Sequence, residues 1–337
     1  MRGRRWRQLR AVGRTIMQDF VRDGAKYSSA DVLLFDAVPS HRGTTRVALG
    51  MMGFKQVFAT SDIDELIQSI SDKPFDVIVA DLTGAAERIC GLVREIRQGD
   101  VGTNPFLSII LTSWSARQDI VNRVMGCGAD DVLIRPYSVS FLAERVHALV
   151  ETRKGFVVTA DYVGPSRRTR ADRADATGLL QVPNTLRVKV KPGETGCSTG
   201  DMMLAVREAR SKVGEMRLVG CALQMRLLAH FASKESGSLD KYLGRMSAFS
   251  RVLYDKLHAR SDPALASGVA SILEAVALMM QGERVTDSLS QCAAQVQIVQ
   301  ARLCSDRSAV EIEQEFTRAV AQFARHEPRA PELKTGT

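Results

Sequence analysis

The sequence predicts an α/β domain built on a doubly wound parallel sheet, followed by an all-α helical bundle. Two patterns predict this order. From residue 31 to about residue 150, short apolar runs alternate with amphipathic segments, as in β-α-β proteins. From about residue 200 onward, apolar residues recur at three- and four-residue steps, as they do on helices. At 337 residues the chain is long enough for two such domains.

The first half contains five expected strands and five expected helices in alternation. The strands are expected at 32–35, 56–59, 76–80, 106–111 and 131–134. The helices are expected at 39–52, 62–70, 85–97, 116–125 and 140–152. Five strand–helix pairs in this length fit a single doubly wound sheet.

Residues 154–198 have the composition of a basic linker, because prolines, glycines and an Arg/Asp-rich patch interrupt the alternation. Within this linker Leu186, Val188 and Val190 alternate with basic residues, which predicts one short strand with a basic face. The helical bundle is expected over 199–327 and a polar tail over 328–337.

The bundle carries clear helix-start signals. Asp262 followed by Pro263 predicts a capped helix start, and Ser308 with Glu311 forms a capping box. The apolar stripes indicate a bundle core or, as the alternative, the seam of a homodimer or of an unknown protein partner. We expect no DNA binding through the bundle, because it lacks a short helix, a glycine turn and a basic recognition helix.

The net charge of +8 is concentrated near the start of the chain. Residues 1–30 hold eight basic and two acidic residues, whereas 31–150 carry a net charge of −4. This basic arm could form an amphipathic helix that binds nucleic acid or a membrane surface. The alternatives are a solvated arm or a true start at Met17.

The remaining composition indicates a cytoplasmic protein. The six cysteines stand singly and without metal-ligand spacing, so they are expected to be reduced core thiols. The longest apolar run, at 269–280, is interrupted by Glu274 and is expected to be too short to span a bilayer.

Polar residues stand at the carboxyl ends of several expected strands. Asp36 ends the first strand, Asp81 the third and Thr112 the fourth, and Arg135-Pro136 ends the fifth. Ligands collect at this edge of a doubly wound sheet. Two carboxylates, a hydroxyl and a cation suit phosphoryl transfer: a carboxylate nucleophile, a Mg²⁺ ligand, and groups that receive phosphoryl oxygens.

Four segments in order resemble the receiver domain of response regulators, a CheY-like, flavodoxin-like domain of bacterial two-component systems. They are LLFDAVPSHRGTTRVALGMMGF, VIVADL, LTSWS and GADDVLIRPYS. The resemblance covers about a third of the chain and implies a receiver domain over 31–153. It also implies phosphorelay signal transduction by a phosphoprotein that is not an enzyme.

By the same resemblance, Asp81 is the phosphoacceptor. It would receive a phosphoryl group from a histidine kinase or phosphotransfer protein, with Mg²⁺ and Asp36 assisting. Thr112 would be the switch hydroxyl, and Arg135-Pro136 would stand for the family's Lys-Pro step.

Three residues depart from the family pattern. Ala37 replaces a second acid, Arg135 replaces a lysine and Val132 replaces the switch aromatic. Loss of the acid is expected to weaken or abolish Mg²⁺ binding, because Mg²⁺ needs an oxygen shell. The domain is therefore either a receiver phosphorylated on Asp81 or a pseudo-receiver that serves as a binding surface. Within the pseudo-receiver interpretation, Asp36 and Asp81 could also do no more than cap neighbouring helices.

His230 in the segment LLAHFASKESGS resembles the start of a histidine phosphotransfer motif. Such motifs have a small residue one turn later, but Lys234 stands there. His230 also falls on the apolar stripe of its helix. A packed histidine is therefore the favoured interpretation, and phosphotransfer is the alternative.

Overall fold

The computed structural model describes residues 26–167, 179–234, 239–259, 262–282 and 285–326. It divides into an N-terminal unit, Met1–Gly214, and a C-terminal unit, Glu215–Thr337. Most of the expected basic arm, most of the Arg/Asp-rich patch and the expected tail lie outside the described residues. The predictions made for those segments therefore stay predictions.

The N-terminal unit is built on a five-stranded parallel sheet. Its strands are β1 (Asp31–Phe35), β2 (Gln56–Thr60), β3 (Val77–Asp81), β4 (Ser108–Ser113) and β5 (Asp131–Ile134). They lie in the order β2-β1-β3-β4-β5, the flavodoxin-like order. The predicted fold class is confirmed, and each observed strand begins and ends within two residues of its expected bounds.

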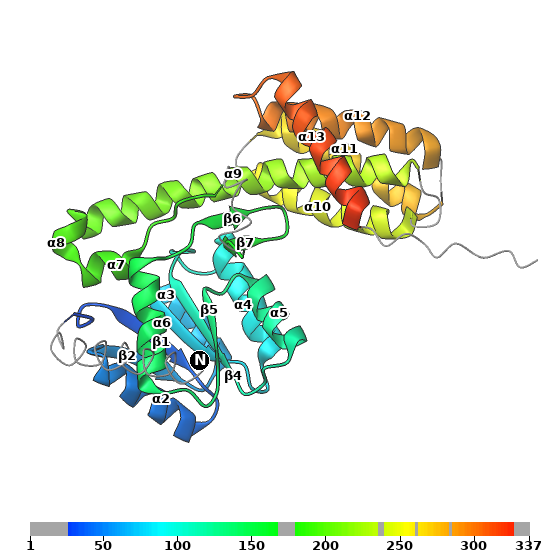
Figure 1. Ribbon diagram of the computed structural model, residues 1–337. Coiled ribbons are helices and arrows are strands. Elements are labelled where there is room, and N and C mark those ends of the chain that lie inside the picture. The colour runs from blue at the N-terminus through cyan, green and yellow to red at the C-terminus, as the bar shows by residue number, and fades with distance from the viewer. Residues whose placement is uncertain (1–25, 168–178, 235–238, 260–261, 283–284, 327–337) are drawn as a thin grey trace, which may run out of the picture. The chain divides into compact units, whose positions relative to one another are not determined.

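Helices cover both faces of this sheet (Figure 1). One face is covered by α2 (Pro39–Met51) and α6 (Val139–Glu151). The other face is covered by α3 (Ile63–Asp72), α4 (Ala86–Gln98) and α5 (Gln118–Cys127). Because both faces are buried, the central strands are continuous apolar runs rather than alternating ones.

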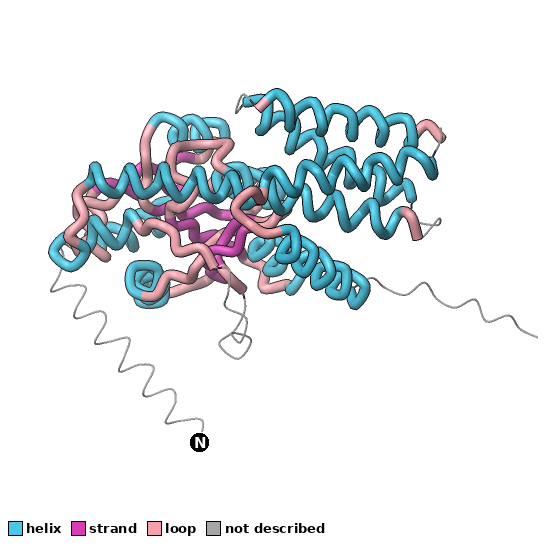
Figure 2. Tube along the Cα trace, turned by 90° about the horizontal axis from the view of Figure 1, so that it is seen from above, coloured by secondary structure: helices cyan, strands magenta, loops and turns pink. Residues whose placement is uncertain are grey.

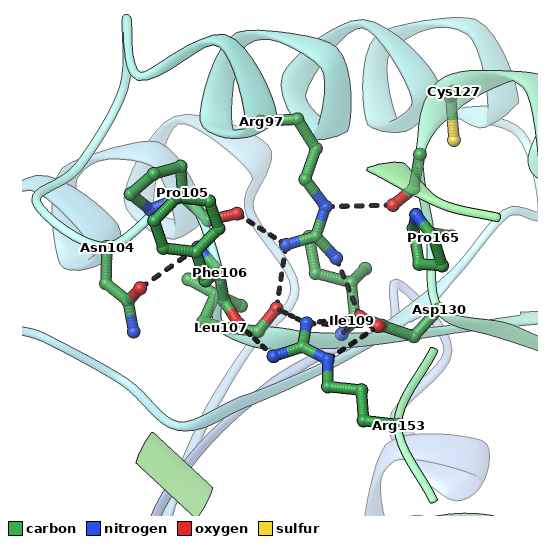
Figure 3. A network of polar contacts seen from close by, with 12 residues as sticks. Arg97, Asn104, Pro105, Phe106, Leu107, Ile109, Cys127, Asp130, Arg153 and Pro165 are labelled. Atoms are coloured by element: carbon green, nitrogen blue, oxygen red, sulfur yellow. Dashed lines mark hydrogen bonds and ion pairs between the residues drawn. The ribbon is translucent and has the colours of Figure 1, made fainter. Parts of the chain in front are cut away.

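A short hairpin of β6 (Phe156–Val158) and β7 (Val163–Pro165) follows the sheet domain. Through Phe156 it packs on two arginines of a polar network at the amino end of the sheet, the network that Figure 3 shows. The guanidinium groups of Arg97 and Arg153 lie 5.2 and 5.3 Å from the ring centre of Phe156. Both also bind the carboxylate of Asp130, at 2.7 and 3.0 Å. This part of the expected linker is therefore packed structure.

The strand predicted around Leu186 is wrong. Residues Thr185–Val190 form the helix α7, and a short turn of helix α8 (Pro192–Thr195) follows. Leu186 and Val190 are four residues apart, so one helical face buries both in the core beside α6. Asn184 caps this helix by accepting a hydrogen bond from the Arg187 amide at 3.1 Å.

The long helix α9 (Thr199–Ala232) runs from the N-terminal unit into the C-terminal unit. Its first half packs on the sheet domain, where Val206 and Val213 are buried with Phe106 and Phe156. The division between the units falls at Gly214, whereas the sequence predicts that the helical domain begins at residue 199.

The described residues of the C-terminal unit form helices joined by short turns (Figure 2). After the second half of α9 come α10 (Leu239–Ala259), α11 (Pro263–Met280), α12 (Val285–Leu303) and α13 (Ala309–His326). Asp262 caps α11 through the Leu265 amide at 3.1 Å. The Ser308–Glu311 capping box forms at α13, with the Ser308 amide 2.8 Å from the Glu311 carboxylate. Both helix starts agree with the sequence prediction.

One described helix, α11, is long and apolar enough to cross a membrane by length and composition alone. It begins at Pro263, so its apolar stretch is longer than the run expected from residue 269. The same test is passed by core helices of soluble proteins, and Val269, Ile272 and Val276 are buried within the unit. The six cysteines are free thiols, and all except the half-exposed Cys197 are buried.

Candidate functional site

The four polar residues predicted at the strand ends come together in the folded N-terminal unit. Asp36 follows β1, Asp81 ends β3 and Thr112 lies near the end of β4, where Asp81 and Thr112 are paired across the sheet. Arg135 follows β5 and brings its guanidinium group back over these three residues. The side chains of Asp36, Asp81 and Thr112 are almost completely buried.

Arg135 is the centre of the site because it binds both carboxylates. Its Nη2 donates to Asp36 Oδ2 at 2.8 Å, and its Nε donates to Asp81 Oδ2 at 3.1 Å. The hydroxyl of Thr112 accepts from Arg135 at 3.2 Å and donates to Asp81 Oδ2 at 2.7 Å. One cation therefore links two acids and a hydroxyl that come from three different strands. The peptide bond between Arg135 and Pro136 is cis.

Backbone amides occupy the other carboxylate oxygens. The amide of Val38 donates to Asp36 Oδ1 at 2.9 Å, and the amide of Thr83 donates to Asp81 Oδ1 at 2.9 Å. Both contacts are to the residue two positions further on, as in Asx turns. The hypothesis that Asp36 and Asp81 cap helices is wrong, because the helices that follow them, α2 and α4, have no side-chain cap.

The two acids have opposite electrostatic behaviour. Burial raises the pKa of Asp36 and the charge of Asp81 adds to the effect, against the Val38 amide and the Arg135 cation. Burial also acts to raise the pKa of Asp81, but hydrogen bonds from Thr83 and Thr112, with the Arg135 charge, outweigh it and lower that pKa. Asp81 is thus the carboxylate held in its charged form.

Aromatic side chains surround the site on its open side. The Arg135 guanidinium lies 5.3 Å from the Tyr137 ring centre, and the Tyr137 hydroxyl is 3.3 Å from Thr45 Oγ1. The His41 and Trp114 rings lie 5.2 Å apart, with Trp114 half exposed. These residues line a small pocket of about 180 Å³ beside Arg135. The sequence did not indicate this pocket, although Tyr137 directly follows Pro136 of the predicted site.

His230 lies far along the chain, on the C-terminal half of α9. Its ring centre is 5.4 Å from that of Phe231 and 5.7 Å from that of Phe316 on α13. Burial lowers its pKa, and Lys234 and Arg226 add to this effect. The geometry is that of a partly packed histidine; its role in phosphotransfer stays a prediction.

Comparisons with known proteins find similarity to response regulators over a little more than a third of the chain. No protein-family model matches the chain. The two-component response regulator PhoP of Pseudomonas aeruginosa is 33% identical over 131 residues, which are 39% of this chain and 55% of that protein. A probable chemotaxis protein CheY of Rhizobium etli is 25% identical over 118 residues, 35% of this chain and 90% of that protein. The chain thus spans about half the length of the Pseudomonas relative.

Two solved structures also match. A response regulator from Thermotoga maritima has 21% identity and a TM-score of 0.31, over 35% of this chain and 95% of that one. An orphan response regulator of H. pylori has 20% identity and a TM-score of 0.31, over 36% of this chain and 96% of that one.

The sheet order and the two curated relatives define the class: the first part of the chain is a CheY-like receiver domain of the response-regulator type. It is joined to a helical unit that these relatives do not identify. The receiver homology supports a role in two-component signalling.

Proposed function

We propose that the receiver domain is a pseudo-receiver, a protein-binding signalling module that does not depend on an aspartyl phosphate at Asp81. The observation that carries this proposal is the position of Arg135, which binds both Asp36 and Asp81. The positive charge that the acids require is already supplied within the chain. Phosphorylation of Asp81 would require this cation to move from between the two carboxylates.

The residues present do not fit a magnesium site of the family type. Mg²⁺ requires a nearly octahedral shell of oxygen ligands. Here Ala37 stands in place of one acid, and each oxygen of Asp36 and Asp81 already accepts a hydrogen bond. Among the described residues, no group of three acidic, histidine or cysteine side chains could hold a metal. We therefore propose that Mg²⁺ binding is weak or lost.

The alternative is a receiver that is phosphorylated on Asp81 by a histidine kinase or phosphotransfer protein. One observation favours it: the lowered pKa of Asp81 keeps this carboxylate ionised, as a nucleophile must be. The hydroxyl of Thr112 lies 2.7 Å from Asp81 Oδ2, where it could bind an oxygen of a phosphoryl group on Asp81.

Mass spectrometry of the intact full chain separates the two candidates. Acetyl phosphate with Mg²⁺ transfers its phosphoryl group to an available carboxylate and releases acetate. We expect no phosphoryl adduct on the wild-type chain. The double variant Ala37→Asp, Arg135→Lys should gain an adduct, because it restores the second acid and frees the pocket from the planar guanidinium.

Adding Asp81→Ala to the double variant serves as the control and should remove the adduct. A wild-type adduct that Asp81→Ala abolishes would contradict the pseudo-receiver and establish the alternative. Circular dichroism of each variant shows whether it has folded.

The proposal also covers the cellular location and the binding partners of the protein. We infer a bacterial cytoplasmic signalling protein without enzymatic turnover, whose receiver domain binds a histidine kinase or phosphotransfer protein. The C-terminal unit would contact a further protein partner of unknown identity. The homology of the receiver domain to PhoP and CheY supports the first partner class.

A further inference from the structure

Two buried cysteines of the N-terminal unit lie side by side. Cys90 belongs to α4 and Cys127 is the last residue of α5, and these two helices pack on each other over one face of the sheet (Figure 1). The Cys90 thiol lies next to the Cys127 sulfur and can donate a hydrogen bond to it. Both side chains are almost completely buried. Neither thiol belongs to the site around Asp81, so the proposed function does not use this pair.

The surroundings of Cys127 favour its thiolate form. The contact with Cys90 has the largest effect. The backbone amide of Ala129 also donates to the Cys127 sulfur, and the cations Arg94 and Arg97 act on it. Together these groups lower the pKa of Cys127 against the effect of burial. The same contact, with burial, raises the pKa of Cys90. Cys127 is therefore the sulfur that ionises first, with a second thiol beside it, as in redox-active cysteine pairs.

Two buried cysteines of the C-terminal unit lack this environment. Burial raises the pKa of Cys304, and it raises the pKa of Cys292 to about 11. An apolar site keeps a thiol protonated, and a protonated thiol reacts slowly with oxidants. Cys127 therefore differs chemically from a thiol that only fills a core.

The helix that carries Cys127 has few buried side chains. Of the ten residues of α5, only Val124 and Cys127 are buried, and no side chain caps the start of the helix. Gly126 is exposed, and no atom lies within 4 Å of the position that a Cβ would take there. A helix with so few buried contacts opens locally more readily than the core of a domain. Local opening of α5 would admit a small oxidant to Cys127.

We propose that Cys90 and Cys127 are a redox pair, which hydrogen peroxide converts to a disulfide between α4 and α5. The Cys127 thiolate attacks one peroxide oxygen, the O–O bond breaks, and the hydroxide that leaves takes up a proton to form water. Cys127 is then a sulfenic acid. The Cys90 sulfur attacks the Cys127 sulfur, and the sulfenic hydroxyl leaves as a second water with the Cys90 proton. Two thiols are oxidised by two electrons in total, and one peroxide is reduced to two waters.

The disulfide would form beside the ion cluster at the amino end of the sheet. Arg97 lies on α4, as Cys90 does, and donates to the carbonyl of Gly128 at 2.8 Å. Gly128 directly follows Cys127. Oxidation would therefore join covalently the two helices whose ends this hydrogen bond already connects, and it gives the receiver domain a redox input that does not involve Asp81.

Peptide mapping of the folded full chain after treatment with hydrogen peroxide tests the proposal. Free thiols are blocked with iodoacetamide, and digestion with trypsin without reduction leaves Cys90 in residues 89–94 and Cys127 in residues 124–145. We expect these two peptides to be joined, with a mass about 2 Da below the sum of the two free peptides. Cys292→Ala is the matched control: it removes another buried cysteine and should leave the joined peptides unchanged.

Two further variants test the chemistry. In Cys90→Ala the joined peptides should disappear, and dimedone should trap Cys127 as a sulfenic acid, because no second thiol attacks it. Arg94→Gln changes an exposed residue and should slow the formation of the joined peptides at neutral pH, because less Cys127 is ionised.

Three outcomes would overturn the proposal. They are a folded wild type that gives no joined peptides, joined peptides that form only after unfolding in urea, and a sulfenic acid that dimedone traps in Cys90→Ala on another cysteine instead of Cys127. None of these outcomes depends on phosphorylation of Asp81.

Discussion

Each end of the receiver sheet holds a buried cluster of arginine and aspartate side chains, but the two clusters contain them in opposite numbers. At the carboxyl end one cation, Arg135, lies between two acids, Asp36 and Asp81. At the amino end one acid, Asp130, lies between two cations, Arg97 and Arg153 (Figure 3). Each group carries an excess of one charge, and each is almost completely buried.

The difference lies in what offsets the excess charge. At the amino end, backbone carbonyl groups accept the remaining N–H groups: Arg97 donates to the carbonyls of Gly128, Pro105 and Leu107 at 2.8, 2.6 and 2.8 Å. At the carboxyl end the offset comes from two backbone amides and the Thr112 hydroxyl. The first end contacts the hairpin through Phe156, whereas at the second end Arg135 lines a small pocket.

The pKa values follow this division. Burial acts to raise the pKa of Asp130, but the charges of Arg153 and Arg97 outweigh it and lower that pKa. Burial lowers the pKa of Arg97 to about 10. At the carboxyl end a single cation serves two acids, so only Asp81 has its pKa lowered, and that of Asp36 is raised. The amino end is therefore a structural ion cluster, and the carboxyl end can still take up a proton.

The largest expected effect is at the amino end. Asp130→Ala leaves Arg97 and Arg153 buried without an acid and should lower the free energy of unfolding by about 3–5 kcal/mol. Urea unfolding of the full chain measures this change. Asp119→Ala, which breaks the exposed pair with Arg117, is the control and should have no measurable effect.

The same cluster predicts a pH dependence. Because the pKa of Asp130 is lowered in the folded chain, its contribution to stability is present above about pH 4, the ordinary value, and is lost as the pH falls through the folded value. The stability difference between wild type and Asp130→Asn should therefore shrink in acid. A difference that stays constant, or an Asp130→Ala variant as stable as Asp119→Ala, would show that the cluster is not structural.

A smaller effect is expected from Arg135→Met. Without the cation, Asp36 and Asp81 face each other, and the free energy of unfolding at pH 7 should fall by about 1–3 kcal/mol. One acid can then take up a proton, so its folded pKa lies above its unfolded value and stability should recover as the pH is lowered. Unfolding curves at pH 5 and pH 7 test this. Arg88→Met, at an exposed pair with Asp64, should not change the pH dependence. If Arg135→Met shows the same pH dependence of stability as Arg88→Met, Arg135 does not offset the charges of Asp36 and Asp81.

The smallest expected change in the free energy of unfolding comes from hydroxyl groups at the two ends of strand β4. Thr112→Val removes the hydroxyl that joins Asp81 and Arg135 and should cost about 0.5–1.5 kcal/mol. Ser108, at the amino end of the same strand, has a buried hydroxyl without a hydrogen-bond partner among the described residues. Ser108→Ala should thus be neutral or slightly stabilising. Equal losses for the two variants in chemical unfolding would indicate that packing, rather than the hydrogen bond, makes Thr112 important.

The sheet and the candidate site could be predicted from the sequence, because strand ends in a parallel sheet meet at one edge. Asp36, Asp81, Thr112 and Arg135 come together for this reason. What could not be predicted is that Arg135 binds both acids, since the sequence does not reveal the side-chain conformation of a long cation.

Helix α7 and the ion cluster at the amino end of the sheet could not be predicted from the sequence. From Leu186 to Val190, alternating apolar residues fit a strand, yet the four-residue step between those two also fits a helix. Lys189 alone does not distinguish a strand from a helix. In the helix its Nζ forms ion pairs with Asp31 and Asp76, at 3.0 and 2.8 Å. The amino-end cluster gave no signal either, since an arginine in the last turn of a helix, like Arg97, is usually exposed.

We propose that Arg135 supplies the positive charge for which Asp36 and Asp81 would otherwise need a metal ion. Calorimetric titration of the full chain with Mg²⁺ tests this proposal. We predict no saturable binding by the wild type, and saturable binding by the Ala37→Asp, Arg135→Lys variant. Saturable Mg²⁺ binding by the wild type that Asp81→Asn abolishes would show that Arg135 does not take the place of the metal ion.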